Sequence, residues 1–197
     1  MKIVYHTALI ALALILVGVP AQAEENAPAI TEDVCNIQVS LFPPIQLCDV
    51  DTAIKGFRFG IFPMNREMQG LDIGLLNWTT HDCTALEWGL VNVVGGDAAG
   101  VQFSIVNIDC KDMVGWEAGA GNLALDDFVG FQSGTLNITG KSAVGVQFGA
   151  VNYAGKMTGL QLGLVNVTKH LSAILLVVLN VAANGFAPVF PIINAAF

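Results

Sequence analysis

Apolar and polar residues alternate along this chain in short segments that share one pattern. The segment G-L-Q-L-G-L-V-N runs from Gly159 to Asn166. In an extended chain Leu160 and Leu162 fall on one side, and Gln161 and Gly163 on the other. Alternation with a period of two residues predicts a β-strand and does not fit an amphipathic helix, whose period is close to 3.6.

This unit recurs along almost the whole chain with a period of 14 or 15 residues. Two earlier units, starting at Asn36 and Gly56, carry Pro in place of the final Asn. About eleven units therefore predict a single β-repeat domain over residues 36–197, because a fixed period of this kind determines the fold. The Asn that ends each of the other units stands at Asn77, Asn92, Asn107, Asn122, Asn137, Asn152, Asn166, Asn180 and Asn194.

Each unit is interpreted as one strand of about 8 to 10 residues and one turn of about five. The connecting segments, such as V-G-G-D-A-A-G from Val94, carry the Gly and Asp residues that favour turns. This arrangement leaves no room for helices, so the fold class is all-β. Asn accepts left-handed backbone angles at the end of a strand, and stacked Asn side chains form amide ladders when equivalent positions lie in register.

Two architectures could bury the apolar side of such strands. The favoured one is an up-and-down antiparallel β-barrel, with the bulky side chains in lipid and the Gln, Gly and Asn residues lining the lumen. Short connections, a mean hydropathy of +0.63 and a terminal Phe197 support the barrel. The alternative is a parallel β-solenoid, with the bulky side chains in the core and Asn in an internal ladder. The near-constant step supports the solenoid, and an odd strand number without long loops counts against the barrel.

The N-terminus has the features of an export signal. Lys2 precedes an apolar run from Ala8 to Val19, and Ala21-Gln22-Ala23 forms a small-x-small cleavage site. Residues 1–23 are therefore predicted to be a signal peptide and residues 24–35 an N-terminal extension. The predicted location is outside the cytoplasm, in the outer membrane or at the cell surface.

Charge argues against one class of partner. The whole chain has a formal net charge of −8, and removal of Lys2 with the signal peptide leaves seven basic against sixteen acidic residues, or −9. Nucleic-acid binding requires a basic surface that releases counterions from phosphates. Nucleic acid is therefore excluded as a partner.

Four cysteines, an even number in an exported chain, predict disulfides. They are Cys35, Cys48, Cys83 and Cys110. Three pairings are possible, and the most local one joins Cys35 to Cys48 and Cys83 to Cys110. None of the four lies in a C-x-x-C pair, so no zinc site is predicted.

Three acidic residues replace Gln in the repeat, namely Asp72, Glu87 and Glu117. They predict an acidic lining of the lumen in a barrel, or a solvated stripe in a solenoid. His81-Asp82-Cys83 resembles a nucleophile with its base, but adjacent side chains point in different directions, whereas catalytic groups converge from separate segments. No catalytic, cofactor-binding or metal-binding residue is predicted.

The repeats resemble those of a known family. The units G-V-Q-F-G-A-V-N from Gly145 and G-F-Q-S-G-T-L-N from Gly130, and the opening S-L-F-P-P-I-Q from Ser40, are similar to bacterial surface-repeat proteins of the leptospiral lipoprotein type. The resemblance covers residues 38–197. It implies an exported surface or outer-membrane repeat protein and carries over no catalytic residues. The chain departs from that type by lacking a Cys at the cleavage site, so the resemblance does not imply a lipid anchor.

The expected function is therefore non-enzymatic. The leading hypothesis is a cell-envelope or outer-membrane surface protein with a structural, pore or binding role, in contact with outer-membrane lipid and without a cofactor. The alternative is a soluble or surface-displayed solenoid that binds an unknown protein or glycan partner. The substitution Asn152→Leu discriminates between them, because only a ladder position should lose much stability.

Overall fold

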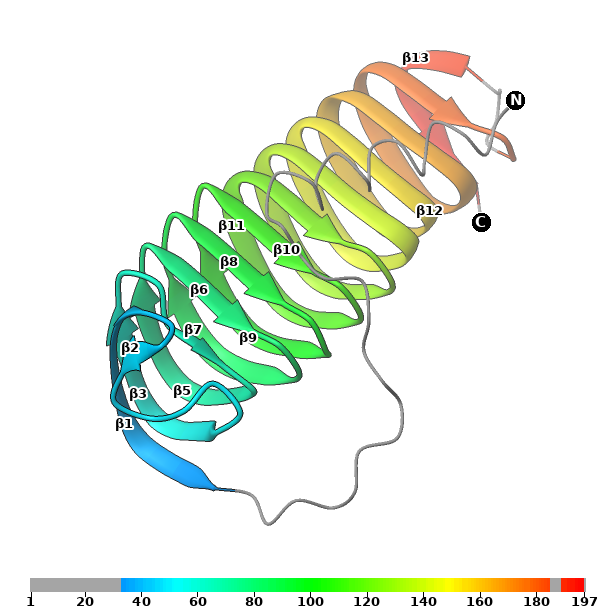
Figure 1. Cartoon of the computed structure of the whole chain (residues 1–197). Helices are drawn as coiled ribbons and strands as arrows, with labels where there is room; N and C mark the ends of the chain where they lie inside the picture. Colours follow the sequence, from blue (N-terminus) through cyan, green and yellow to red (C-terminus); the bar gives the residue numbers. More distant parts are fainter. Residues whose placement is uncertain (1–32, 185–188, 197) are drawn as a thin grey trace, which may run out of the picture. The chain divides into compact units, whose positions relative to one another are not determined.

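The computed structural model describes residues 33–184 and 189–196, so the predicted signal peptide and most of the extension lie outside the described residues. The described chain consists of β-strands that wind round one axis (Figure 1). The strands are β1 (Val34–Phe42), β2 (Ile45–Gln46), β3 (Ala53–Gly60), β4 (Met64–Asn65), β5 (Glu67–Gly74), β6 (Leu76–Thr79), β7 (Cys83–Trp88), β8 (Val91–Val94), β9 (Ala98–Phe103), β10 (Val106–Asp109), β11 (Met113–Ala124), β12 (Phe128–Ala182) and β13 (Val189–Ala195).

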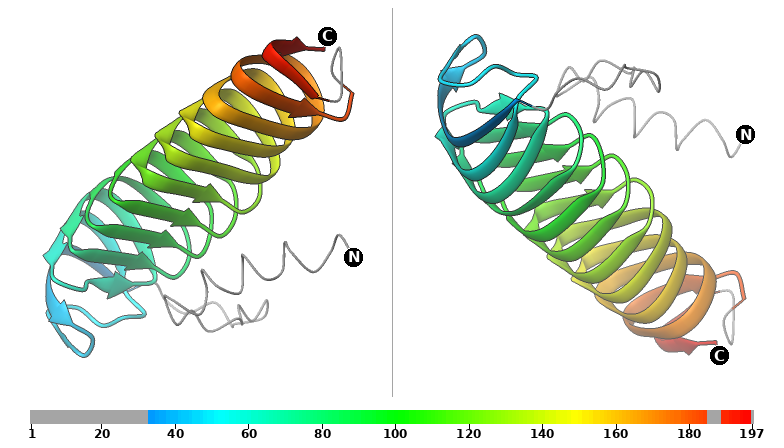
Figure 2. Two further views of the ribbon diagram at one scale, coloured as in Figure 1. Left: turned by 90° about the horizontal axis from the view of Figure 1, so that it is seen from above. Right: turned by 90° about the horizontal axis from the view of Figure 1, so that it is seen from below.

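Consecutive repeats pair in parallel and in register. Asn107 of β10 pairs with Asn92 of β8 on one side and with Asn122 of β11 on the other. β7 pairs in parallel with β5 and β9 in the same way. Figure 2 shows the resulting stack of coils from two sides. The fold is therefore a parallel β-solenoid of about ten turns, and the prediction of an antiparallel barrel is wrong.

The barrel prediction was wrong because each repeat unit forms one complete coil of the solenoid and not a single strand followed by a hairpin turn. In the third Asn unit, β9 runs along one side of the coil, β10 along a second, and the polar segment Cys110–Asp112 returns the chain to β11. The apparent hairpin turn is one corner of the coil. In β12 the coils follow one another without a break, so this element is a winding ribbon and not a straight strand.

Both ends of the stack carry an antiparallel strand. At the first coil β2 folds back on β1, and at the last coil β13 pairs antiparallel with β12. The eleventh predicted unit, which ends at Asn194, is therefore this final strand and not another coil. Such strands cover the open edges at which a stack of parallel coils would otherwise pair with other chains.

The first coil is also closed by a disulfide between Cys35 and Cys48, which belongs to the most local of the three possible pairings. The other bond of that pairing, between Cys83 and Cys110, is absent from the described residues, where both cysteines are free. Cys83 is buried in the interior, whereas Cys110 is half-buried at a corner of the coil.

The interior of the solenoid is lined by polar side chains. The Asn of each unit is buried, and from Asn77 to Asn166 each donates from Nδ2 to Oδ1 of the next Asn, as in Asn122 to Asn137 at 2.8 Å and Asn137 to Asn152 at 2.8 Å. The Gln positions form a second buried column, in which Gln161 donates to Gln147 at 2.6 Å. The bulky side chains therefore point outward, contrary to the expectation for a solenoid, because amides stacked in register satisfy one another and need no water.

A third inward column supplies the apolar core. It lies at the first or second residue after the polar corner and was not identified from the sequence. Its members are all buried and are Ile54, Met68, Cys83, Ala98, Met113, Phe128, Ala143, Met157 and Leu171.

Glycine is required where coils approach most closely. At Gly74 a Cβ atom would lie 2.3 Å from Oδ1 of Asn77, so a side chain there would disrupt the Asn ladder. Gly115 has φ of +146°, and a Cβ atom there would lie 1.9 Å from the carbonyl oxygen of Gly100. Both values exclude a larger residue without movement of the backbone.

We expect Asn152→Leu to destabilise the protein strongly. Asn152 Nδ2 donates to Asn166 Oδ1 and to the Leu162 carbonyl, and its Oδ1 accepts from Asn137. Leucine would leave these buried partners unpaired at about 1–3 kcal/mol each. Denaturant unfolding followed by circular dichroism should show a large fall in the midpoint.

Thr135→Leu is the matched control for Asn152→Leu, because Thr135 is exposed at a repeat position that other units fill with Leu. Equal midpoints for the two variants would contradict a stabilising role for the ladder.

Candidate functional site

Charged side chains interrupt the amide column at the N-terminal half of the solenoid. Arg58 and Asp72 are both fully buried and form an ion pair, with Nε donating to Oδ1 at 2.9 Å and Nη2 to Oδ2 at 2.5 Å. Arg58 also donates to Thr79 Oγ1 at 2.9 Å and to the Trp78 carbonyl at 3.1 Å. The guanidinium therefore compensates the charge of Asp72 inside the coil.

Next along the axis is a cluster of three further carboxyl groups, which we call the buried acidic cluster. It consists of Glu87, Asp109 and Glu117, all fully buried. Gln102 lies between them and donates from Nε2 to Glu87 Oε2 at 2.8 Å and to Asp109 Oδ1 at 2.9 Å. Gln132 donates to Glu117 Oε2 at 2.6 Å. Within the described residues no N–H group donates to the second oxygen of any of these carboxyl groups.

Burial raises the pKa of all three carboxyl groups. The pKa of Glu87 rises to about 8, because burial and the Asp72 charge outweigh the opposing effects of Arg58 and Gln102. Burial raises the pKa of Glu117 to about 7, against the hydrogen bonds from Gln132 and Asp109. Burial and the charge of Glu117 raise the pKa of Asp109 well above its usual range. Asp109 and Glu117 lie close enough for a hydrogen bond, which two carboxyl groups form only when one is protonated.

The structure brings two of the three predicted acidic residues into this cluster and places the third beside it. Glu87 and Glu117 belong to the cluster, and Asp72 is paired with Arg58. None of the three forms a solvated stripe, because all are sealed inside the coil. Sequence reasoning missed Arg58, in the Gln slot, and Asp109, two residues after an Asn, where Thr79 and Thr139 occupy the same inward position.

The interior offers no surface for catalysis. Burial raises the pKa of the Cys83 thiol well above its usual value, so Cys83 is a poor nucleophile. His81 is exposed at a corner, where Nδ1 lies 3.1 Å from Thr80 Oγ1. Among residues 33–184 and 189–196, no group of three or more His, Cys, Asp or Glu side chains could hold a metal ion. The side chains that a ligand or partner can reach therefore lie on the outer surface.

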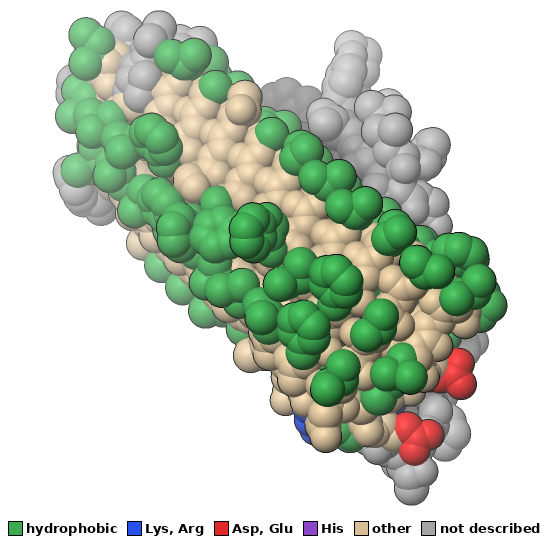
Figure 3. Space-filling model, turned by 90° about the vertical axis from the view of Figure 1, so that its left-hand side faces the viewer, with side chains coloured by type: hydrophobic (Ala, Val, Ile, Leu, Met, Phe, Trp, Pro, Cys, Tyr) green, Lys and Arg blue, Asp and Glu red, His purple; other side chains and the backbone are tan. Residues whose placement is uncertain are grey.

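The outer surface carries the bulky side chains of the repeat in rows along the axis (Figure 3). We call the outward side of β5, β7, β9, β11 and the first coils of β12, together with the corner that follows it, the apolar face. Its exposed large side chains include Leu71, Leu75, Leu86, Trp88, Leu90, Ile105, Val114, Trp116, Val129, Phe131, Val144, Phe148 and Leu164. Large contiguous apolar surfaces are uncommon on soluble monomers and are typical of interaction sites.

Aromatic rings pack against one another across three coils of the apolar face. Trp116 makes edge-to-face contacts with Phe103, at a centroid distance of 5.1 Å, and with Phe131, at 6.0 Å. The three rings form a ridge over neighbouring coils. Large, rigid side chains of this kind contribute much of the energy at binding surfaces.

Charge is confined to a different side of the coil, which we call the polar edge. Between residues 73 and 184, each Asp, Glu, Lys or Arg outside the interior lies in the corner segment that follows the Asn strand. The aspartates there form a ladder, in which the backbone N–H of Asp97 donates to Asp82 Oδ1 at 2.9 Å and that of Asp127 to Asp112 Oδ1 at 3.1 Å. The outer surface is therefore amphipathic around the coil.

In comparisons with known proteins, no protein-family model, curated protein or solved structure matches the chain. The resemblance to bacterial surface-repeat proteins thus remains a prediction from the repeat motif. Among the described residues there is also no helix of the length and hydropathy needed to span a bilayer.

The buried acidic cluster predicts that stability falls as the pH rises. The unfolded chain releases the Glu protons near pH 4.5, whereas the folded chain retains those of Glu87 to about pH 8 and those of Glu117 to about pH 7. Between these values the folded state binds more protons, so the free energy of unfolding decreases from about pH 5 to about pH 9, by a few kcal/mol. Thermal unfolding measured across this range should show the decrease.

The double variant Glu87→Gln/Glu117→Gln should flatten this pH dependence. Asp112→Asn is the control, since it removes an exposed carboxylate from the polar edge. Asp109 remains in the double variant and can keep part of the slope. A slope as steep as that of the wild type, or one that Asp112→Asn reduces equally well, would contradict the assignment to the interior.

Proposed function

We propose that the protein is a non-catalytic, surface-displayed β-solenoid of the cell envelope that acts by binding. The observation that carries this proposal is the apolar face, which runs over successive coils and contains no charged side chain between residues 73 and 184. The repeat motif with its export signal supports a location outside the cytoplasm.

The partner that fits this surface best is membrane lipid. The apolar face and the polar edge occupy different sides of the coil, which is the arrangement of a structure that lies in a membrane interface. In that orientation the apolar side chains enter the headgroup and acyl boundary, and the Asp and Lys side chains stay in water. A glycan fits less well, because it needs polar groups that the apolar face does not offer.

A protein partner is the second candidate. The ridge of Phe103, Trp116 and Phe131 favours it, since aromatic residues with edge-to-face packing are typical anchors of protein interfaces. Such a partner would cover the same face, so the two candidates compete for one surface.

Vesicle flotation tests the lipid proposal. We expect the purified protein to float with phosphatidylcholine vesicles, and the double variant Val114→Asp/Trp116→Asp to float roughly tenfold less, because membrane binding scales with the apolar area buried. Both side chains point outward, with exposed fractions of 52% and 42%, so the coil should remain folded by circular dichroism.

The control variant is Lys111→Ala/Lys141→Ala, which changes the net charge by the same −2 at the polar edge. It should float like the wild type. Absence of flotation by the wild type, or equal loss in both double variants, would overturn the lipid proposal.

A photo-crosslinking residue at position 116 in intact cells separates the two candidates. An adduct of lipid size supports membrane lipid, and an adduct of protein size supports a protein partner.

A further inference from the structure

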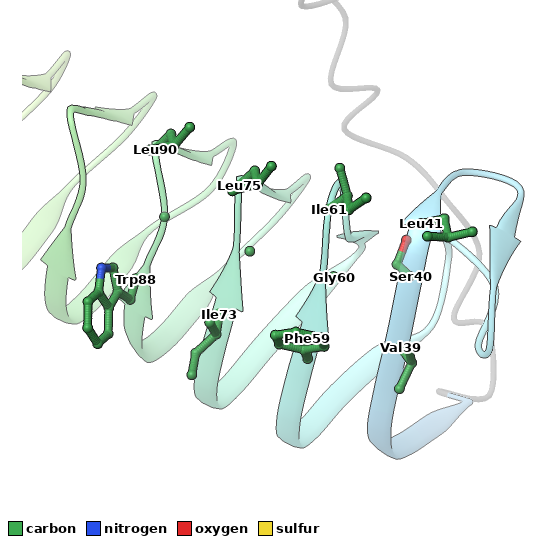
Figure 4. Close-up of a pocket in the computed structure, with 12 residues that line it drawn as sticks. Val39, Ser40, Leu41, Phe59, Gly60, Ile61, Ile73, Leu75, Trp88 and Leu90 are labelled. Carbon is green, nitrogen blue, oxygen red and sulfur yellow. The ribbon is translucent and has the colours of Figure 1, made fainter.

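An open groove runs along the axis over the first four coils, at the edge of the apolar face (Figure 4). One wall is a row with one side chain from each coil, formed by Val39, Phe59, Ile73 and Trp88. The other wall is a second row, two residues later in each coil, formed by Leu41, Ile61, Leu75 and Leu90. The groove encloses about 630 Å³.

The floor between the two rows is backbone. It consists of the residue between the two wall positions in each coil, which is Ser40, Gly60, Gly74 or Gly89. Glycine is present here because the Asn ladder lies directly beneath, as at Gly74 and Asn77. Because the residue at this position points into the coil, only backbone lies between the two rows on the outside.

The groove offers almost no hydrogen-bonding groups. Its only polar side-chain atoms are Ser40 Oγ, which already donates to the Phe62 carbonyl at 3.0 Å, and Trp88 Nε1 at one end. The backbone groups of the coils bond along the axis, as from Leu90 N to the Leu75 carbonyl at 2.9 Å and from Ile61 N to the Ser40 carbonyl at 2.9 Å. A peptide in this groove would leave its own backbone groups unpaired, whereas a hydrocarbon chain has none.

The length and width of the groove match those of one acyl chain. Coils are spaced by about 4.8 Å, so the three intervals from Val39 to Trp88 span about 14 Å. A bilayer core about 30 Å thick holds two chains end to end, which makes one chain about 15 Å long. The walls are two residues apart on an extended chain, or about 7 Å, which leaves room for a single chain.

The two rows end where the repeat changes. The coil after Trp88 still carries Phe103 and Ile105 at the wall positions, but the next coils carry Ala118 and Ala120, and then Ser133 and Thr135, which are too small to continue the rows. The site is therefore confined to the N-terminal coils and is not a general property of the solenoid.

We propose that this groove binds the acyl chain of a single-chain lipid, lying along the solenoid axis between the two rows. The inference goes beyond the proposed function, because it assigns one ligand to one site and does not depend on adsorption of the apolar face to a bilayer.

The experiment uses the full chain with Trp78→Phe/Trp116→Phe, which leaves Trp88 as the single tryptophan. The probe is dibromostearate below its micellar concentration, whose bromine atoms quench nearby indole fluorescence. We expect saturable quenching with one molecule bound per chain.

The variant Leu75→Asp should weaken the binding of dibromostearate at least tenfold. Leu164→Asp is the matched control, because Leu164 occupies the same repeat position outside the groove and is similarly exposed, at 58% against 52%. It should leave the affinity unchanged. Circular dichroism establishes that both variants are folded.

Quenching that does not saturate, or an equal effect of the two Asp variants, would overturn the proposal. Self-association that Leu75→Asp abolishes, without saturable binding of the probe, would overturn it in favour of a second copy of the chain. A protein that binds the probe but does not float with vesicles upholds the groove site and overturns the lipid-surface proposal alone.

Discussion

The hydrogen bond between equivalent amides of neighbouring coils is the interaction on which this fold depends. Each Asn in the ladder donates to the next, at 2.8–3.0 Å from Asn77 to Asn180. These bonds form only when consecutive repeats lie in parallel register, so the ladder enforces the 14- to 15-residue period. It also places amides in the interior and glycine beside them, and it leaves the bulky side chains of the same strands on the outside.

A carboxyl group inside the coil does not fit the hydrogen-bond pattern of the amide columns. An amide both donates and accepts, whereas a carboxylate only accepts. The chain resolves this conflict once with a cation, through Arg58 at Asp72, and three times with raised pKa values, at Glu87, Asp109 and Glu117. A protonated carboxyl group again carries a donor, so protonation restores the pattern that Gln supplies elsewhere.

The sequence predicted the repeat, the all-β class and disulfides, and it presented the solenoid as an alternative and the Cys35–Cys48 bond as part of one of three pairings. It did not predict which side of each strand faces the interior, because alternation shows that a strand has two different sides but not which of them is buried. Whether Gln161 or Leu162 points inward is determined only by the register of neighbouring coils. In the apolar column, Met113 and Phe128 were missed because they stand beside the turn Asp residues, outside the octad that carries the visible repeat. The groove could not be predicted either, since it needs the rows of four coils at once.

An interior built from amides has a consequence for the outside. Hydrophobic burial normally supplies most of the stability of a domain, but here the apolar core is one column with a few further side chains beside it, such as Val94 and Ala124. The larger side chains of Trp88, Ile105 and Leu164 remain about half exposed. A partner that covers these side chains removes apolar surface from water that folding left exposed. Because such a partner binds the folded coil and not the unfolded chain, its binding stabilises the solenoid by mass action. Binding and stability are therefore coupled in this protein through the same outward rows of side chains. The polar interior sets the register of the coils, and burial of the outward side chains by a partner provides hydrophobic free energy that folding alone does not.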